Sequence, residues 1–273
     1  MADRRFVFLI GAARSGTKFL RDTLAASRDV AAVPYDINYV WRHGNENCPH
    51  DEIAPEDIDD KTARHIRTTV KRLALKDRND SPSIILEKTV SNTLRMETVR
   101  RIFPEAEFIV LERDGLDVTE SAYRQWTAPN SRNYLLQKLR YFPVREWRYA
   151  IWFGRNLASR SDGPPIWGPR YEEIHRDLAE LGTPQTCAQQ WVSSVRSARS
   201  ATSEADTLHV EYDSLTGPSG LAAVLHSLDI EDHERVVDRL ATSFRHVATW
   251  PGSTPEDAQS ACAEIVETVS RQT

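Results

Sequence analysis

A glycine-bounded turn between a short apolar run and a helical pattern is the feature of this sequence that most constrains its fold. Residues 6–10 have the length and composition of a buried strand, and apolar residues recur on one helical face over 19–24. Gly11 and Gly16 bound the turn between them. Such a turn directs backbone N–H groups and a helix N-terminus toward one point, where they can bind an anion. The sequence therefore predicts an anion-binding loop at the end of the first strand.

Strand and helix signals alternate along the rest of the first half. A helix is expected from about residue 55 to 76, with Pro55 in its first turn, and Asp114 is placed to cap a helix that begins near Gly115. Such β-α-β alternation indicates an α/β fold, with helices on both faces of a central parallel sheet. The other expected elements are strands at 31–33, 83–86, 108–111 and 208–212, and helices at 96–103, 185–201, 220–228 and after 257.

Residues 127–170 interrupt this alternation. They are rich in Trp, Arg and Tyr and end in the Pro/Gly-rich stretch SDGPPIWGPR. We expect a lid or insertion packed against the sheet, because a linker would not carry so many aromatic residues. With no internal repeat and no clear boundary, residues 1–273 are expected to form a single domain.

Composition and charge limit the possible functions. A net charge of −5 gives no global basic field for nucleic acid, so an anionic ligand would need local Arg and Lys residues. Three cysteines, Cys48, Cys187 and Cys262, have no metal-ligand or redox spacing and are expected to be free thiols. The first apolar run is too short for a signal peptide or a membrane span. We therefore expect a cytoplasmic protein without stable membrane insertion.

The order of residues after Gly16 separates this loop from that of nucleoside triphosphatases. The loop has the G-x-x-x-x-G spacing of a P-loop, and a P-loop-like three-layer α/β/α fold is predicted from it. In a P-loop, however, Lys follows the glycine directly, and the next Ser or Thr binds Mg²⁺. Here Thr17 comes first, so Lys18 is rotated by about 100° around the helix. With Arg14 in the loop and Arg113 after the fourth strand, cations replace the metal, and no metal site is expected.

Two segments resemble the sulfotransferases that use 3′-phosphoadenosine 5′-phosphosulfate (PAPS). GAARSGTKFLRDTL resembles their 5′-phosphosulfate loop, and FPEAEFIVLERDGLDVTESAY resembles the segment that binds the 3′-phosphate. LEKTVSNTLRMETVRRIFPEAEFIVLERDG and CAQQWVSSVRSARS…LHVEYDSL are similar to the corresponding parts of tyrosylprotein sulfotransferases and their bacterial relatives. The resemblance covers most of the chain and is weakest over 37–80 and 127–170. It implies that PAPS is the co-substrate.

The resemblance assigns cofactor contacts residue by residue. Arg113 and Ser121 match the pair on the 3′-phosphate, where a guanidinium offers two fixed donors and a hydroxyl a third. Tyr212 matches a tyrosine near the adenosine, although a tyrosine of the core would fit the same place. The 5′-phosphosulfate end is assigned to Arg14, Ser15, Gly16, Thr17 and Lys18.

Catalytic roles follow in the same way. Lys88 matches a lysine near the transferring sulfuryl group, where it and Arg14 would stabilise developing charge; a solvated lysine after a strand is the alternative. Asp36 matches a catalytic Glu of the family, and the shorter side chain leaves a turn or cap residue as its alternative. His43 and His50 are further candidates for the base. The acidic stretch HDEIAPEDIDD is interpreted as a solvated helix start, with a role in acceptor binding as the alternative.

These assignments predict sulfuryl transfer from PAPS to an acceptor hydroxyl, in line and without a metal. Aromatic and Arg residues at 141–170 could form a stacking surface for a carbohydrate or another small-molecule acceptor, or simply a packed lid. The alternatives are a small-molecule kinase with a P-loop, which would have no 3′-phosphate to bind, and a non-catalytic nucleotide-binding protein, which would not need Lys88 or Asp36. The acceptor and the oligomeric state stay open.

Overall fold

A computed structural model places five parallel strands at the centre of the molecule. The structure describes residues 4–128, 166–202, 205–216, 218–243 and 250–270. Within these residues the sheet has the order β2-β3-β1-β4-β5, and each neighbouring pair is parallel. The strands are β1 (Arg5–Ile10), β2 (Val30–Ala32), β3 (Ile84–Glu87), β4 (Glu107–Glu112) and β5 (Thr207–Glu211). The predicted parallel sheet is confirmed.

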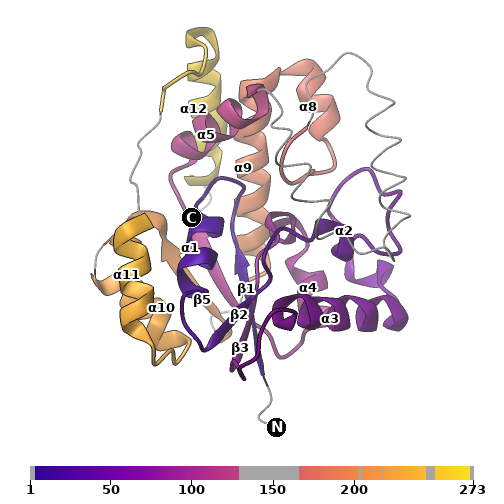
Figure 1. The fold of residues 1–273 in the computed structure, drawn as a ribbon. Helices are drawn as coiled ribbons and strands as arrows, with labels where there is room; N and C mark the ends of the chain where they lie inside the picture. Colours follow the sequence, from indigo (N-terminus) through magenta and orange to yellow (C-terminus); the bar gives the residue numbers. More distant parts are fainter. Residues whose placement is uncertain (1–3, 129–165, 203–204, 217, 244–249, 271–273) are drawn as a thin grey trace.

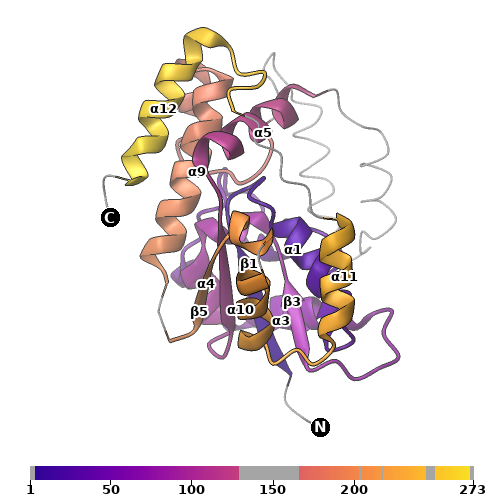
Figure 2. The ribbon, with the colours of Figure 1, turned by 90° about the vertical axis from the view of Figure 1, so that its left-hand side faces the viewer.

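Alternation along the strands sends side chains to both faces of the sheet. On β1, Phe6, Phe8 and Ile10 belong to one core cluster, whereas Val7 and Leu9 belong to another. The first cluster packs against α2 (Asn38–Trp41), α3 (Asp60–Leu75) and α4 (Met96–Ile102). The second packs against α1 (Thr17–Leu24), α10 (Pro218–Ser227) and α11 (His233–Ser243). Figures 1 and 2 show the sheet between these two helical layers, which confirms the three-layer α/β/α fold.

A separate group of helices lies beyond the carboxyl ends of the strands (Figure 1). α9 (Thr183–Ser200) packs along both α5 (Gly115–Thr127) and α12 (Glu256–Ser270), and α8 (Ile174–Glu180) packs on α9. Val118, Trp191, Val192, Val195 and Val269 are buried together at this contact. As predicted, Asp114 caps α5, with its side chain accepting a hydrogen bond from the Asp117 amide. These helices therefore lie next to the loops that follow the carboxyl ends of the strands.

The helix expected from residue 55 to 76 is wrong at its start. Pro55–Asp57 forms a separate 3₁₀ turn, Ile58 is extended and buried, and α3 begins at Asp60. Asp59 caps α3 by accepting a hydrogen bond from the Thr62 amide at 2.7 Å. A buried apolar residue and a better cap thus overrode the preference of proline for the first turn.

Two other points concern the limits of the prediction. The expected lid or insertion at 127–170 lies for its greater part, 129–165, outside the residues described. Helices α2, α8 and α11 were not predicted. Among the described residues, none of the helices has the length and apolar character to span a membrane.

The strand order sets the place of the first loop. From β1 the chain proceeds to β2 and β3 on one side, and it reaches β4 and β5 on the other. The loop after β1 lies at this reversal, flanked by the ends of β3 and β4. In open α/β sheets, ligands bind at such a switch point, beyond the carboxyl ends of the strands.

Candidate functional site

The loop between β1 and α1 is held in a tight turn by local contacts. Arg14 and Gly16 both have positive φ, of 74° and 99°. The Ser15 hydroxyl is buried and donates to the Ala12 carbonyl at 2.7 Å, which closes the turn. Thr17, also buried, begins α1, so the free N–H groups of the first helical turn lie directly beyond the loop. The expected turn between the first strand and its helix is present, and anion binding there stays a prediction.

Arg14 points from this loop toward α5. Its Nε donates to the Ser121 hydroxyl at 3.0 Å, and its guanidinium lies 5.9 Å from the centroid of the Trp167 ring. Although Arg14 is exposed as a residue, packing around its guanidinium lowers its pKa, and the charges of Arg124 and Arg113 lower it further. The Arg14 guanidinium, which is bonded to Ser121, is therefore close enough to those of Arg113 and Arg124 to feel their charge. A bound anion would relieve their mutual repulsion.

Tyr212 lies between the two predicted ends of the cofactor site. It is buried directly after β5, with its ring against Gly16, where an added Cβ would collide with it. The Arg113 guanidinium lies over the same ring, 4.7 Å from its centroid, and also pairs with Asp117 at 3.4 Å. Tyr212 thus connects the loop with Arg113. Its contact with adenosine stays a prediction.

On the other side of the loop, Lys88 and Asp36 form an ion pair. Lys88 directly follows β3, and its Nζ lies 3.7 Å from Asp36 Oδ2. Asp36 also accepts hydrogen bonds from the amides of Asn38, at 3.2 Å, and Val90, at 3.0 Å. Burial lowers the pKa of Lys88, and the charge of Asp36 acts in the opposite direction. The structure therefore brings the candidate base next to the candidate catalytic lysine.

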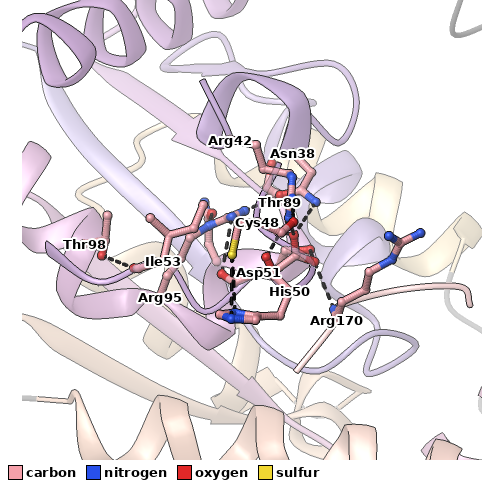
Figure 3. A network of polar contacts seen from close by, with 12 residues as sticks. Asn38, Arg42, Cys48, His50, Asp51, Ile53, Thr89, Arg95, Thr98 and Arg170 are labelled. Atoms are coloured by element: carbon pink, nitrogen blue, oxygen red, sulfur yellow. Dashed lines mark hydrogen bonds and ion pairs between the residues drawn. The ribbon is translucent and has the colours of Figure 1, made fainter. Parts of the chain in front are cut away.

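A buried ionic network contacts the turn after Asp36 through Asn38 (Figure 3). Asp51 pairs with Arg42 at 2.8 Å and lies 4.0 Å from Arg95. Its carboxylate also accepts hydrogen bonds from Asn38, at 3.0 Å, and from the Arg170 amide, at 2.9 Å. Burial alone would raise the pKa of Asp51, but Arg95 and Arg42 lower it below its ordinary value. The acidic stretch around Asp51 is thus not simply a solvated helix start.

The structure also places the remaining predicted residues. Lys18 is exposed and pairs with Asp22 at 2.5 Å, one turn along α1. His43 stacks on His65 with ring centroids 3.9 Å apart, whereas His50 contacts Cys48 at 3.7 Å. Unlike Asp36, neither histidine is found paired with Lys88 in the described contacts.

Sequence reasoning missed several charged residues of this region, among them Arg124 and Asp51. Arg124 could have been found, because it lies one helical turn after Ser121 and so shares its face of α5. Asp51 gave no such signal, since it stands in a run of acidic residues. Within the described part of the chain, no group of three or more His, Cys, Asp or Glu residues has the geometry of a metal site.

Comparison with known proteins identifies the class to which this fold and loop belong. A family model described as "Sulfotransferase family" matches residues 7–165, more than half of the chain. The chain therefore belongs to the sulfotransferase family, and the resemblance noted from its motifs is confirmed. A comparison with curated protein sequences finds no match.

Solved structures agree with this fold. The sulfotransferase domain from the curacin biosynthetic pathway is 12% identical, with a TM-score of 0.52 and 99% of each chain covered. The sulfotransferase domain of the Synechococcus PCC 7002 olefin synthase is 15% identical, with a TM-score of 0.50, over 99% of this chain and 96% of that one. A mouse sulfotransferase complexed with PAP is 13% identical, with a TM-score of 0.50, over 100% of this chain and 86% of the other.

Proposed function

We propose that this sulfotransferase moves a sulfuryl group from PAPS to an acceptor hydroxyl and releases adenosine 3′,5′-bisphosphate (PAP). One observation carries the proposal: cations lie on both sides of the glycine loop at the switch point of the sheet. Arg14, bonded to Ser121, lies near Arg113 and Arg124 on the β4 side, and Lys88 follows β3 on the other. A cofactor with a phosphate at one end and a phosphosulfate near the loop matches this distribution.

The residues divide into two groups by what they would hold. Arg113 and Ser121, with Arg124 beside them, would bind the 3′-phosphate through charge-assisted hydrogen bonds. The loop residues 14–18 would bind the phosphosulfate, where the N-terminus of α1 adds its positive end. Tyr212 would lie against the nucleoside between them. PAPS itself supplies the activated sulfuryl group.

Lys88 and Asp36 would act at the transfer step. Transfer in line leaves negative charge on the bridging and leaving oxygens, and a cation already in place at Lys88 lowers that barrier, together with Arg14. The Asp36 carboxylate would accept the proton of the attacking hydroxyl. Its bonds to the Asn38 and Val90 amides leave lone pairs on the carboxylate for the acceptor. In this scheme the cations of the chain take the part that Mg²⁺ has in phosphoryl transfer.

The mouse sulfotransferase with PAP bound supports the choice of nucleotide, because its fold covers the whole of this chain. For the acceptor, a carbohydrate or another small molecule with a hydroxyl is our proposal. Trp167, half-buried beside Arg14, is our candidate for the aromatic side chain on which a sugar ring or an aromatic ring of the acceptor would stack.

A transfer assay with radiolabelled PAPS tests this function directly. A panel of carbohydrate, phenolic and aliphatic hydroxyls is offered, and we expect label in at least one acceptor together with stoichiometric PAP. The Lys88→Ala variant serves as the control for transfer that does not depend on the site. Transfer of a terminal phosphoryl group from ATP, with no transfer from PAPS, would instead establish the kinase alternative.

A further inference from the structure

Glu87 is a fully buried carboxylate next to the candidate transfer site. It is the last residue of β3, only 1% exposed, and it immediately precedes Lys88. Each of its carboxylate oxygens accepts a hydrogen bond: Oε1 from the Thr89 hydroxyl at 2.6 Å, and Oε2 from the Asn92 side chain at 2.9 Å. A carboxyl group buried at this depth is costly unless hydrogen bonds compensate for the water it has lost.

The first bond leads directly to the turn that carries Asp36. The Thr89 hydroxyl donates to Glu87 and at the same time accepts from the Ile37 amide at 3.1 Å. Ile37 is the residue after Asp36. The orientation of this hydroxyl depends on Glu87 being an acceptor, since a hydroxyl has a single proton to donate.

The second bond reaches the same turn from the other direction. Asn92, held by Glu87, accepts from Arg95 Nε at 3.0 Å, and Arg95 donates in turn to the Asn38 side-chain oxygen. The backbone N–H of the same residue, Asn38, donates to Asp36 at 3.2 Å. The two routes from Glu87 therefore end at the two residues that follow Asp36.

We propose that Glu87 is a positioning residue, whose buried carboxylate fixes Thr89 and Asn92 and thereby holds the Asp36 turn against Lys88. The expected effect on catalysis rests on the proposed function, whereas the positioning of the Asp36 turn through Thr89 and Asn92 does not. Its negative charge also favours the charged form of Lys88, whose pKa is lowered by burial. The other charged groups that interact electrostatically with Glu87 or Lys88 are Asp36, Arg95 and Arg21.

The test compares Glu87→Gln with a double variant that restores both bonds. An amide has one acceptor oxygen, so Glu87→Gln retains at most one of the two routes. In Glu87→Gln/Asn92→Asp, the new amide can donate to the carboxylate introduced at position 92, which can still accept from Arg95. Glu107→Gln is the matched control, because Glu107 pairs with Arg5 at the opposite end of the strands.

We expect Glu87→Gln to lower kcat by about 10-fold to 100-fold, the scale of a small misplacement of a reacting group. The affinity for PAP stays within about twofold, since no cofactor contact is removed. The double variant recovers most of the rate, and Glu107→Gln retains it. Unchanged turnover in Glu87→Gln, or a loss of rate that the double variant does not repair, would overturn the inference.

A second measurement does not depend on activity. Amide hydrogen exchange of the full chain, resolved at Ile37 and Asn38 by NMR, should become about 10-fold faster at one or both of these backbone amides in Glu87→Gln, because the variant loses at least one of the two routes that end there. Unchanged exchange would overturn the positioning role even in an active enzyme. If the wild type binds no PAP, the proposed function fails, and this exchange still decides the inference. Should Glu87→Gln not fold, Thr89→Val removes the first route alone and is measured in its place.

Discussion

Arg14 donates a hydrogen bond to Ser121 at 3.0 Å, although the two residues are separated by 107 positions in the chain. Arg14 belongs to the loop after β1, and Ser121 to the helix that follows β4. The two motifs that resemble the phosphosulfate loop and the 3′-phosphate segment therefore meet through their own side chains. The adjacency of β1 and β4 in the sheet brings the two motifs together.

The first prediction concerns which nucleotide binds. We expect PAP to bind, ATP to bind much more weakly, and chelation of divalent metal to leave the affinity for PAP unchanged. The reason is that Lys18 is exposed and paired with Asp22, so it does not have the place of a P-loop lysine. Isothermal calorimetry with and without chelator measures both affinities. Tight ATP binding that requires magnesium would contradict the sulfotransferase mechanism proposed here.

The second prediction separates binding from catalysis. Arg113→Ala should weaken PAP binding by about 2–5 kcal/mol, the cost of removing one partner from a desolvated charge pair. Lys88→Ala should mainly lower kcat, because its contribution arises in the transition state. Calorimetry and steady-state kinetics on both variants check this division. The reverse pattern would show that the two ends of the cofactor have been exchanged.

The third prediction concerns the base. Asp36→Asn should reduce turnover by about 10²–10⁴-fold while leaving the affinity for PAP nearly unchanged. The amide retains the size of the side chain and an acceptor for the Asn38 or Val90 amide, so the fold should persist. A pH–rate profile should also lose its acidic limb. Near-normal turnover would eliminate Asp36, and His43 and His50 would then be tested in the same way.

The fourth prediction concerns pH and stability. Burial, aided by the charge of Asp36, raises the pKa of Glu87 to about 7. The folded protein therefore binds a proton here that the unfolded chain has lost, between the usual range of a glutamic acid and about pH 7. Stability from this group is present at low pH and declines as the pH rises through that window. Urea unfolding from pH 5 to 8 should show the wild type losing stability relative to Glu87→Gln; a parallel pH dependence would contradict this.

The fifth prediction concerns the loop. Gly16→Ala should destabilise the fold by about 1–2 kcal/mol from its left-handed backbone alone, and further because its methyl group meets the ring of Tyr212. Gly44→Ala is the control for a positive φ: φ is 84° there, and the nearest atom to an added Cβ is the Thr62 hydroxyl at 3.3 Å. Urea denaturation compares the two. We also expect the affinity for PAP to fall only in Gly16→Ala. Equal losses of stability and affinity would show that contact with Tyr212 is unimportant.

Much of this fold could be predicted because its signals are local. The apolar runs became strands within one or two residues of the expected ends, and Asp114 capped α5 as its position indicated. Lys88 and Asp36 could be proposed as site residues because they match functional positions of the family that the sequence resembles. Their pairing was not predictable from the spacing, since it depends on the turn that returns the Asp36 carboxylate to Lys88.

Other features depend on contacts between distant segments. Asp51 was hidden among acidic neighbours, and only its meeting with Arg42 and Arg95 distinguishes it. Glu87 stood inside an apolar run, but nothing in the sequence showed which donors would satisfy it. The false start predicted for α3 has the same origin, because burial of Ile58 decided where the helix could begin. Local propensity therefore defined the elements, and tertiary contacts defined the network between them.

The Asp51 network also limits how this part of the chain can change during evolution. Asp51 neutralises two guanidinium groups that are each 3% exposed or less, so losing its charge would leave Arg42 and Arg95 repelling each other inside the protein. A replacement at one of the three is tolerable only if the others are replaced as well. We therefore expect these positions to covary among homologues, and a chimera that exchanges residues 38–53 alone with a divergent homologue to fold poorly.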